Sequence, residues 1–260
     1  MIKIVSFYKD INLEHEKTKK LKGRISFDYK SCQKKLFETL KKINTSYEFI
    51  ISTDNSTCLE PYTKIERNSL DNKLLMEAVA ISNNNFIQKE SGKIILLGAD
   101  HLFCGDPKIL FDEEFDIALF VVDQFDQTHC TNINNTLIVI NSNKKNINSI
   151  RQFFKDRLEI CLNLPLHERR WFADQKSLSL LLEKESIISN YHKNKNTFFM
   201  FKDLKIKLIP WGSKYLKIVD KLGNYKQDPD DVLIDFCGDY TIKKNLEKIY
   251  QQIIEKYDNL

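Results

Sequence analysis

Residues 93–107 read Lys93-Ile94-Ile95-Leu96-Leu97-Gly98-Ala99-Asp100-His101-Leu102-Phe103-Cys104-Gly105-Asp106-Pro107. The run from Lys93 to Leu97 is short, apolar and followed by small residues, which predicts a buried β-strand. Asp100 comes just after it, and a carboxylate at the end of a buried strand is costly to hold without a partner. A bound cation or a hydrogen-bonded ribose would offset that cost, and so would a turn that Asp100 caps. From these residues alone both interpretations stay open.

On both sides of this strand, short β-branched runs alternate with longer amphipathic segments. This alternation is typical of an α/β domain whose mixed, Rossmann-like central sheet has helices on both faces. Further strands are expected at Ile2–Phe7, Tyr47–Ser52, Phe115–Val122, Thr136–Asn141, Phe198–Phe201, Ile206–Ile209 and Val232–Phe236. Helices are expected at Tyr29–Ile43, Leu70–Ser82, Asn148–Cys161, Asp174–Glu183 and Thr241–Tyr257. No repeat or clear linker interrupts the pattern, so residues 1–260 are expected to form one domain.

Composition excludes several classes of protein. The chain has 260 residues, 42% of them hydrophobic, which is enough for a full core. Charged residues make up 29%, and no apolar run approaches the roughly 20 residues of a membrane-spanning helix. Six cysteines are scattered singly, which indicates reduced thiols in a cytoplasmic protein. The net charge of +4 comes from interleaved lysines and acids, so nucleic acid is not an expected partner.

Polar residues follow three of the expected strands. They form the segments Ser6–Asp10, Thr53–Asn55 and Gly98–His101. In open α/β sheets, ligands bind beyond the carboxyl ends of the strands, because the loops there converge on one crevice. These three segments are therefore the first candidates for a binding site.

The stretch from 93 to 107 resembles the DxD region of GT-A glycosyltransferases, in the form of glycogenin-like and bacterial galactosyltransferase-like enzymes. In that form an apolar strand leads into Asp-Ala-Asp, a few apolar residues and Gly-Asp-Pro, and the Asp pair binds a divalent cation on the diphosphate of a nucleotide sugar. Here Gly98 replaces the first Asp and Asp100 remains. The implied cofactor, Mn²⁺ or Mg²⁺, needs several oxygen ligands, so either another acid completes the site or the enzyme works without a tightly bound metal. His101 is a further candidate ligand, although adjacent residues at a strand end often point to opposite faces.

A second segment, Trp171–Leu178, is similar to the aromatic, small, Asp-Gln segment of the same family. There the Asp-Gln pair lies against the transferred sugar and the acceptor, which implies these roles for Asp174 and Gln175. If the enzyme inverts configuration, Asp174 is the first candidate for the general base. The simpler alternative is that Asp174 is the N-cap of a helix and Gln175 faces solvent.

A third segment, Val232–Lys244, resembles the closing His-Phe-x-Gly-x-x-Lys segment of these enzymes. The family His is a metal ligand and the Lys meets the diphosphate. Asp235 occupies the His position, where a carboxylate would compensate for Gly98. Lys243 or Lys244 would supply the positive charge.

The resemblance implies transfer of a sugar from a nucleotide sugar, in the first place a UDP-sugar, to a hydroxyl of a glycan or glycolipid acceptor. Residues 1–141 would hold the nucleotide sugar, and residues 142–260 would form the acceptor side and the C-terminal helix.

Four residues near the first strand ends are candidates for holding the nucleotide. Phe7 or Tyr8 would stack on the base, and Asp54 would accept hydrogen bonds from the base or the ribose. Lys73, at the start of the second expected helix, would reach the phosphates, although a solvated lysine is the simpler interpretation.

Two other functions fit the same layout. A sugar nucleotidyltransferase would carry a glycine-rich phosphate loop after the first strand, and Ser6–Asp10 contains no glycine. A non-catalytic relative that binds a sugar nucleotide stays open because of Gly98. The lysines of the C-terminal helix also allow peripheral contact with the inner face of an anionic membrane, although a packed helix with a wet basic face is the simpler explanation.

Overall fold

The computed structural model describes ten segments of the chain, residues 1–10, 28–43, 46–59, 63–70, 72–122, 132–169, 172–210, 212–218, 231–236 and 245–258. The strands in these segments are β1 (Ile2–Phe7), β2 (Tyr47–Asp54), β3 (Lys64–Asn68), β4 (Lys93–Leu97), β5 (His101–Phe103), β6 (Ile117–Val121), β7 (Ile133–Asn141), β8 (Phe198–Phe201), β9 (Leu204–Pro210), β10 (Lys217–Ile218) and β11 (Leu233–Asp235). The helices are α2 (Tyr29–Lys41), α3 (Leu75–Lys89), α4 (Ile147–Asn163), α5 (Ala173–Glu183), α6 (Ile187–Asn194) and α8 (Leu246–Asp258), with a 3-10 turn, η2 (Pro107–Phe111). None of these helices combines the length and the apolar composition needed to cross a bilayer.

The larger of two sheets has eight strands in the order β3-β2-β1-β4-β7-β6-β9-β8. Strands β1 to β4 run parallel to one another, and β9 runs parallel to β6. Strand β7 runs antiparallel to both of its neighbours, β4 and β6. The carboxyl ends of β1 to β4 therefore lie along one edge of the sheet, and β7 begins at that same edge.

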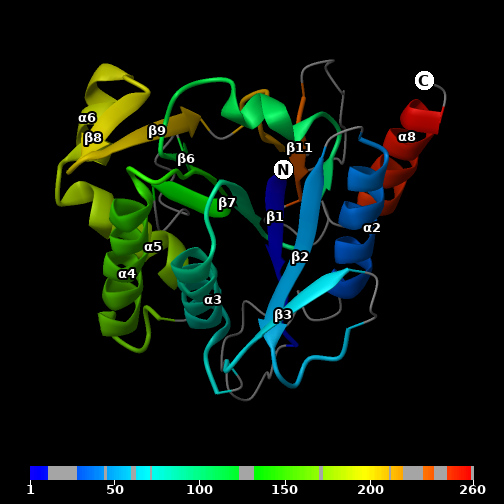
Figure 1. Ribbon diagram of the computed structural model, residues 1–260, viewed down its shortest axis with the longest axis horizontal. Coiled ribbons are helices and arrows are strands. Elements are labelled where there is room, and N and C mark those ends of the chain that lie inside the picture. Colours follow the sequence, from blue (N-terminus) through cyan, green and yellow to red (C-terminus); the bar gives the residue numbers. More distant parts are fainter. Residues whose placement is uncertain are drawn as a thin grey trace.

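Helices cover both faces of this sheet (Figure 1). On one face, apolar side chains of α3, α4, α5 and α6 pack against the sheet in a cluster that includes Phe86, Phe153 and Leu178. On the other face, α2 and η2 contribute Leu36 and Leu110 to a second cluster. The expected α/β architecture, with a mixed central sheet between layers of helices, is confirmed.

A second sheet of three strands, β10-β11-β5, lies at the carboxyl end of β4. Strand β11 pairs antiparallel with β5, and this register sets Asp235 opposite His101. Helix α8 packs on these strands, because Ile253 shares a buried cluster with Leu102 and Ile234. Two segments that are about 130 residues apart in the sequence thus meet beside the end of β4.

The Gly-Asp-Pro sequence after β5 has a local structural reason. A Cβ atom at Gly105 would lie only 2.2 Å from the backbone oxygen of Asp231, so a side chain does not fit there. Asp106 caps the following turn by accepting a hydrogen bond from the Lys108 amide at 2.8 Å, and Pro107 occupies the first turn. The motif therefore joins the small sheet to η2.

Sequence patterns do not predict five of the described elements, namely β3, β5, β10, α6 and the 3-10 turn η2. Strand β3 lies at the edge of the large sheet, and Ile65 is its single apolar residue, so it lacks the buried run of an inner strand. Strand β5 has three residues and α6 has eight, too few for a periodic pattern to emerge.

Helix α5 begins at Ala173, one residue earlier than expected. Its N-cap position is Phe172, which has a left-handed backbone with a φ of 71° and makes no side-chain cap hydrogen bond. The alternative in which Asp174 is the N-cap is therefore wrong. Asp174 lies inside the first turn of the helix, where its side chain is buried.

Candidate active site

The carboxyl end of β4 leads directly into the candidate site. After Leu97 the chain turns through Gly98 and Ala99, and Asp100 follows with its side chain 16% exposed. His101 begins β5 and is completely buried. The Nδ1 atom of His101 lies 3.2 Å from the Gly98 carbonyl oxygen and 3.9 Å from Oδ1 of Asp100. The turn therefore folds back on itself and brings an acid and an imidazole together.

Asp235 joins this pair from β11. It is completely buried, and its Oδ1 lies 3.7 Å from Nε2 of His101. Its Oδ2 accepts a hydrogen bond of 3.0 Å from the hydroxyl of Thr136, which fixes the orientation of the carboxylate. One ligand atom each from Asp100, His101 and Asp235 can be chosen so that all three lie within 4.8 Å of one another. This grouping fits a divalent cation, because carboxylate oxygens and an imidazole nitrogen are ordinary ligands for such ions.

A bulge in β7 connects this group to the opposite face of the sheet. Leu119 and Phe120, which are neighbours on β6, pair with Ile138 and Asn134 of β7, so three residues of β7 have no partner on β6. The side chain of Asn134 accepts a hydrogen bond of 2.8 Å from the amide of Thr136 and so holds the bulged backbone. Bulges re-aim side chains, and this one turns consecutive residues toward different elements.

Asp174 reaches the site through this bulge. Asn135 donates a hydrogen bond of 2.5 Å to Oδ2 of Asp174, while Thr136, the next residue, contacts Asp235. The carboxylates of Asp174 and Asp235 are therefore each held by one of two consecutive residues at the start of β7. Asp174 is thus connected to Asp235, and through it to the group with Asp100, by the two residues Asn135 and Thr136.

The electrostatic surroundings of Asp174 are unusual for a carboxylate. Burial raises its pKa, and the positive charge of Arg157 on α4 partly offsets this effect, as does the hydrogen bond from Asn135. Arg157 is itself buried, and its Nη2 donates to the backbone oxygen of Asp174 at 3.3 Å. Burial also raises the pKa of the neighbouring Cys161 thiol to about 12, so this cysteine is an inert neutral group.

The ends of β1 and β2 carry the residues expected to hold a nucleotide. Phe7 is 9% exposed and packs against Leu70 and Ala78, which conflicts with the expectation that it stacks on a base. Tyr8 is half-buried, and its hydroxyl donates to Asp10 at 2.7 Å. Tyr8 is therefore the aromatic candidate that remains at this end of the sheet.

Asp54 is buried and organises its own loop. Its carboxylate accepts hydrogen bonds from the Thr57 amide at 2.7 Å and the Ser56 hydroxyl at 3.2 Å. Although burial acts in the opposite direction, these hydrogen bonds lower the pKa of Asp54. Nearby, Arg67 donates to three backbone oxygens of the same loop, including that of Asp54 at 2.8 Å. The contacts of Asp54 are thus those of a residue that shapes the turn after β2.

Lys73 is exposed just before α3, and its backbone oxygen accepts a hydrogen bond of 2.8 Å from Lys9. Lys9 also donates to the backbone oxygen of Leu70, so a buried ammonium group ties the end of β1 to the start of α3. Gln175 is half-buried in the first turn of α5, beside Asp174. Lys243 and Lys244 lie outside the described residues, so their predicted role beside a diphosphate stays a prediction.

Sequence patterns do not single out Asn135, Thr136 or Arg157. A polar run directly before an apolar strand is the signal that marks the first two, since Asn134-Asn135-Thr136 precedes the apolar part of β7. Arg157 lies on the buried face of the amphipathic helix α4, at a position where the helical spacing predicts an apolar residue. Only the tertiary contact with α5 identifies it.

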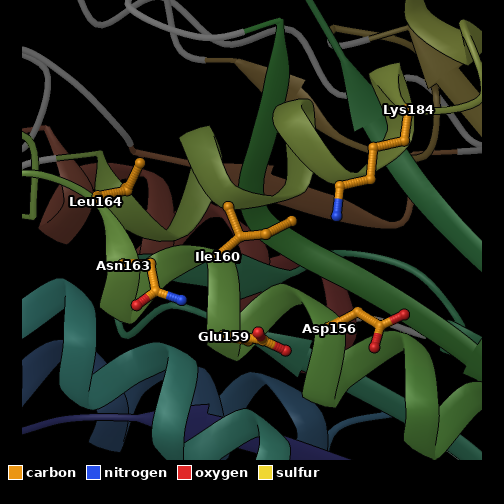
Figure 2. A pocket seen from close by; sticks show the side chains of 6 residues that line it. All are labelled: Asp156, Glu159, Ile160, Asn163, Leu164 and Lys184. Atoms are coloured by element: carbon orange, nitrogen blue, oxygen red, sulfur yellow. The ribbon is translucent and has the colours of Figure 1, made fainter.

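A groove of about 480 Å³ lies elsewhere, beside α4 and the end of α5 (Figure 2). It is lined by Asp156, Glu159, Ile160, Asn163, Leu164 and Lys184. None of the candidate residues lines this groove, which separates it from the site at the edge of the sheet.

No family model matches the chain, and no curated protein matches it. Among solved structures, it is similar to the apo form of the glycosyltransferase GlyE of Streptococcus pneumoniae TIGR4, with a TM-score of 0.54 and 10% identity over 99% of this chain and 63% of the GlyE chain. It is also similar to an active-site mutant of LgtC, with a TM-score of 0.50 and 10% identity over 98% of this chain and 95% of that chain. The chain thus spans less than two thirds of GlyE. At this identity the likeness concerns the fold, which is the GT-A type that the sequence resemblance implies.

Proposed function

We propose that this chain is a glycosyltransferase that moves a sugar from a nucleotide-sugar donor, a UDP-sugar, to a hydroxyl of a glycan or lipid-linked acceptor. The observation that carries the proposal is the meeting of Asp100 and Asp235 at the carboxyl end of β4, in a fold similar to those of GlyE and LgtC over nearly the whole chain. In open α/β sheets this edge is where ligands bind.

Asp100 and Asp235 would hold a divalent cation, Mn²⁺ or Mg²⁺. Such an ion neutralises the negative charge that develops on a leaving diphosphate. Their own contribution is to present carboxylate oxygens in a fixed orientation, and the Thr136 hydroxyl that contacts Asp235 supports this. Lys243 and Lys244 are proposed to add positive charge to the same diphosphate.

Asp174 and Gln175 are proposed to orient the donor sugar and the acceptor hydroxyl. Catalysis of this kind requires the two reacting groups to be held in line. In an inverting reaction the Asp174 carboxylate would take the proton of the acceptor hydroxyl; burial raises its pKa, and the nearby positive charge of Arg157 partly offsets that effect and favours the ionised form that a base needs. Tyr8, Asp54 and Lys73 are proposed to form the nucleotide side, in residues 1–141, while residues 142–260 form the acceptor side.

The test is a thermal-shift and hydrolysis experiment with UDP-sugars, with and without Mn²⁺. We expect UDP-sugars to stabilise the wild-type protein and to be hydrolysed slowly without an acceptor. We expect Asp100→Asn and Asp235→Asn to lose the Mn²⁺-dependent part of both signals. Asp203→Asn is the matched control, because Asp203 is exposed in the turn between β8 and β9.

Other outcomes would point to the competing functions. Release of pyrophosphate from nucleoside triphosphates would identify a nucleotidyltransferase. Binding of UDP-sugars by the wild-type protein without any turnover would identify a non-catalytic relative. Either result would contradict the proposed glycosyl transfer.

A further inference from the structure

The buried imidazole of His101 has one nitrogen with a partner and one without. Its Nδ1 lies 3.2 Å from the Gly98 carbonyl oxygen, whereas its Nε2 is buried with no hydrogen-bond partner. A carbonyl oxygen only accepts hydrogen bonds, so this contact places the proton on Nδ1 and leaves the lone pair on Nε2. A histidine whose other nitrogen donates to a carbonyl is in the tautomer and orientation that metal-binding histidines use.

The unpartnered Nε2 faces Asp235, and Asp100 lies on the Nδ1 side of the same ring. Nε2 lies 3.7 Å from Oδ1 of Asp235, which is longer than a hydrogen bond. Two ligand atoms that share an ion about 2.1 Å from each of them are roughly 3–4 Å apart. One ligand atom from each of Asp100, His101 and Asp235 can be chosen so that all three lie within 4.8 Å of one another. This spacing fits a shared cation better than a direct contact.

Because residue 98 is a glycine, no side chain at this position crowds the imidazole of His101. A Cβ atom at Gly98 would lie 3.0 Å from Oδ1 of Asp100 and 3.4 Å from Cε1 of His101. A side chain at position 98 would therefore begin in contact with both Asp100 and His101. The small residue at 98 and the buried imidazole at 101 are therefore linked by packing.

We propose that His101 is the third protein ligand of the metal, in the place that an acidic side chain at position 98 would fill. The metal site then selects first-row transition ions such as Mn²⁺ and Co²⁺ over Mg²⁺. The physical reason is that carboxylate and water oxygens suit Mg²⁺, whereas imidazole nitrogen suits transition metals. This ligand assignment rests on the proposed function for the location of the metal, and its test measures the metal directly.

The first experiment is pulsed electron paramagnetic resonance of the wild-type protein with Mn²⁺, once alone and once with UDP. A coordinated imidazole produces a ¹⁴N hyperfine coupling that carboxylate ligands do not produce. We expect this coupling in wild type and in His167→Asn, whose side chain is 80% exposed. We expect it to disappear in His101→Asn, together with about a tenfold or greater loss of Mn²⁺ affinity. The affinity for Mg²⁺ should change by less than about twofold.

The second variant is Gly98→Asp, which does not remove the buried imidazole. We expect the new carboxylate to weaken the ¹⁴N coupling and to shift the ratio of affinities toward Mg²⁺. Mn²⁺ bound to the wild-type protein without ¹⁴N coupling would overturn the assignment, and so would coupling that survives in folded His101→Asn. Nitrogen coupling in a protein that turns over no UDP-sugar would support the assignment and count against the proposed function. Turnover of a UDP-sugar with bound Mn²⁺ but without nitrogen coupling would support the proposed function and overturn the assignment of His101.

Discussion

Asp174 is a buried carboxylate whose ionisation depends on its neighbours Arg157 and Asn135. The carboxyl group is buried under the first turn of α5, and burial favours the protonated form. Arg157 opposes this effect from α4, and Asn135 donates a hydrogen bond to the ionised group. The packing of α4 against α5 therefore affects how far the pKa of Asp174 is raised.

This environment predicts how stability changes with pH. Because the pKa of Asp174 is raised in the folded protein, its contribution to stability is fully present below the unfolded pKa of about 3.9 and is lost as pH rises through the folded pKa. We therefore expect the free energy of unfolding of wild type, relative to Asp174→Asn, to fall as the pH rises from about 4 through the raised folded pKa of Asp174. Urea unfolding at several pH values measures this difference. A difference that stays constant over this pH range would contradict the expectation.

Gly105 has tighter surroundings than Gly92 and Gly98 in the described part of the chain. Its missing Cβ would meet the backbone of Asp231 at 2.2 Å, and backbone cannot move aside as a side chain does. We expect Gly105→Ala to lower the free energy of unfolding by about 1–3 kcal/mol. The comparison is Gly98→Ala, whose Cβ meets the flexible end of Asp100 at 3.0 Å and should cost less. Equal losses for both variants in chemical denaturation would show that the close approach at Gly105 has no special weight.

At the scale of elements, two neighbouring residues in the bulge at the start of β7 contact two different acids. Asn135 contacts Asp174 on α5, and Thr136 contacts Asp235 on β11. In a regular strand successive side chains point to opposite faces of the sheet. The positions of Asn135 and Thr136 along the sheet would then depend on the strand register alone. Residues 135–137 have no partner on β6, and this bulge lets the side chains of Asn135 and Thr136 each reach a different acid.

This division predicts separable effects. Thr136→Val keeps the shape and removes the hydroxyl that orients Asp235, so we expect a loss of about tenfold in Mn²⁺ affinity. Asn135→Ala should leave Mn²⁺ affinity within about twofold and should instead raise the pKa of Asp174, because a hydrogen bond to its ionised form is lost. Metal titration and the pH dependence of unfolding distinguish the two. Equal loss of metal binding in both variants would mean that the bulge acts as one unit.

At the scale of the whole molecule, the site depends on elements that belong to different layers. Asp174 comes from the helices on one face of the large sheet, and Asp235 and His101 come from the small sheet. Helix α8 supports that small sheet, since Ile249 and Ile253 lie in the same buried cluster as Leu102 of β5. Loosening α8 is therefore expected to affect the metal site from a distance.

Ile253→Ala tests this support. Ile253 is 1% exposed, and truncation of such a residue costs about 2–5 kcal/mol of unfolding free energy. We also expect weaker Mn²⁺ binding, because the strands that carry His101 and Asp235 lose part of their packing. Ile254→Ala is the matched control, since Ile254 is the next residue of α8 and is only half-buried. Destabilisation without any change in metal affinity would show that the small sheet holds its geometry without α8.

The parts of this fold that the sequence predicts are those set by local patterns. Strands β1 and β4 have the expected bounds, because each is a short apolar run ending in polar or small residues. Strand β3 and the bulge in β7 are not predictable in this way, since pairing with neighbours defines them and apolar periodicity does not. In the site, the family resemblance brings Asp100 and Asp235 to attention. Arg157 and Thr136 act through tertiary contacts and carry no local signature.

The pairing of β5 with β11 also has a consequence during protein synthesis. Chains are made at about 5–20 residues per second, so a segment that emerges with β5 waits on the order of ten seconds for its partner strand. Throughout that interval the apolar side chain of Leu102 lacks the cover of β11 and α8, which are translated later, although Cys32 of α2 has already been made. The nascent chain therefore presents an incompletely covered apolar strand until residues 233–258 are made.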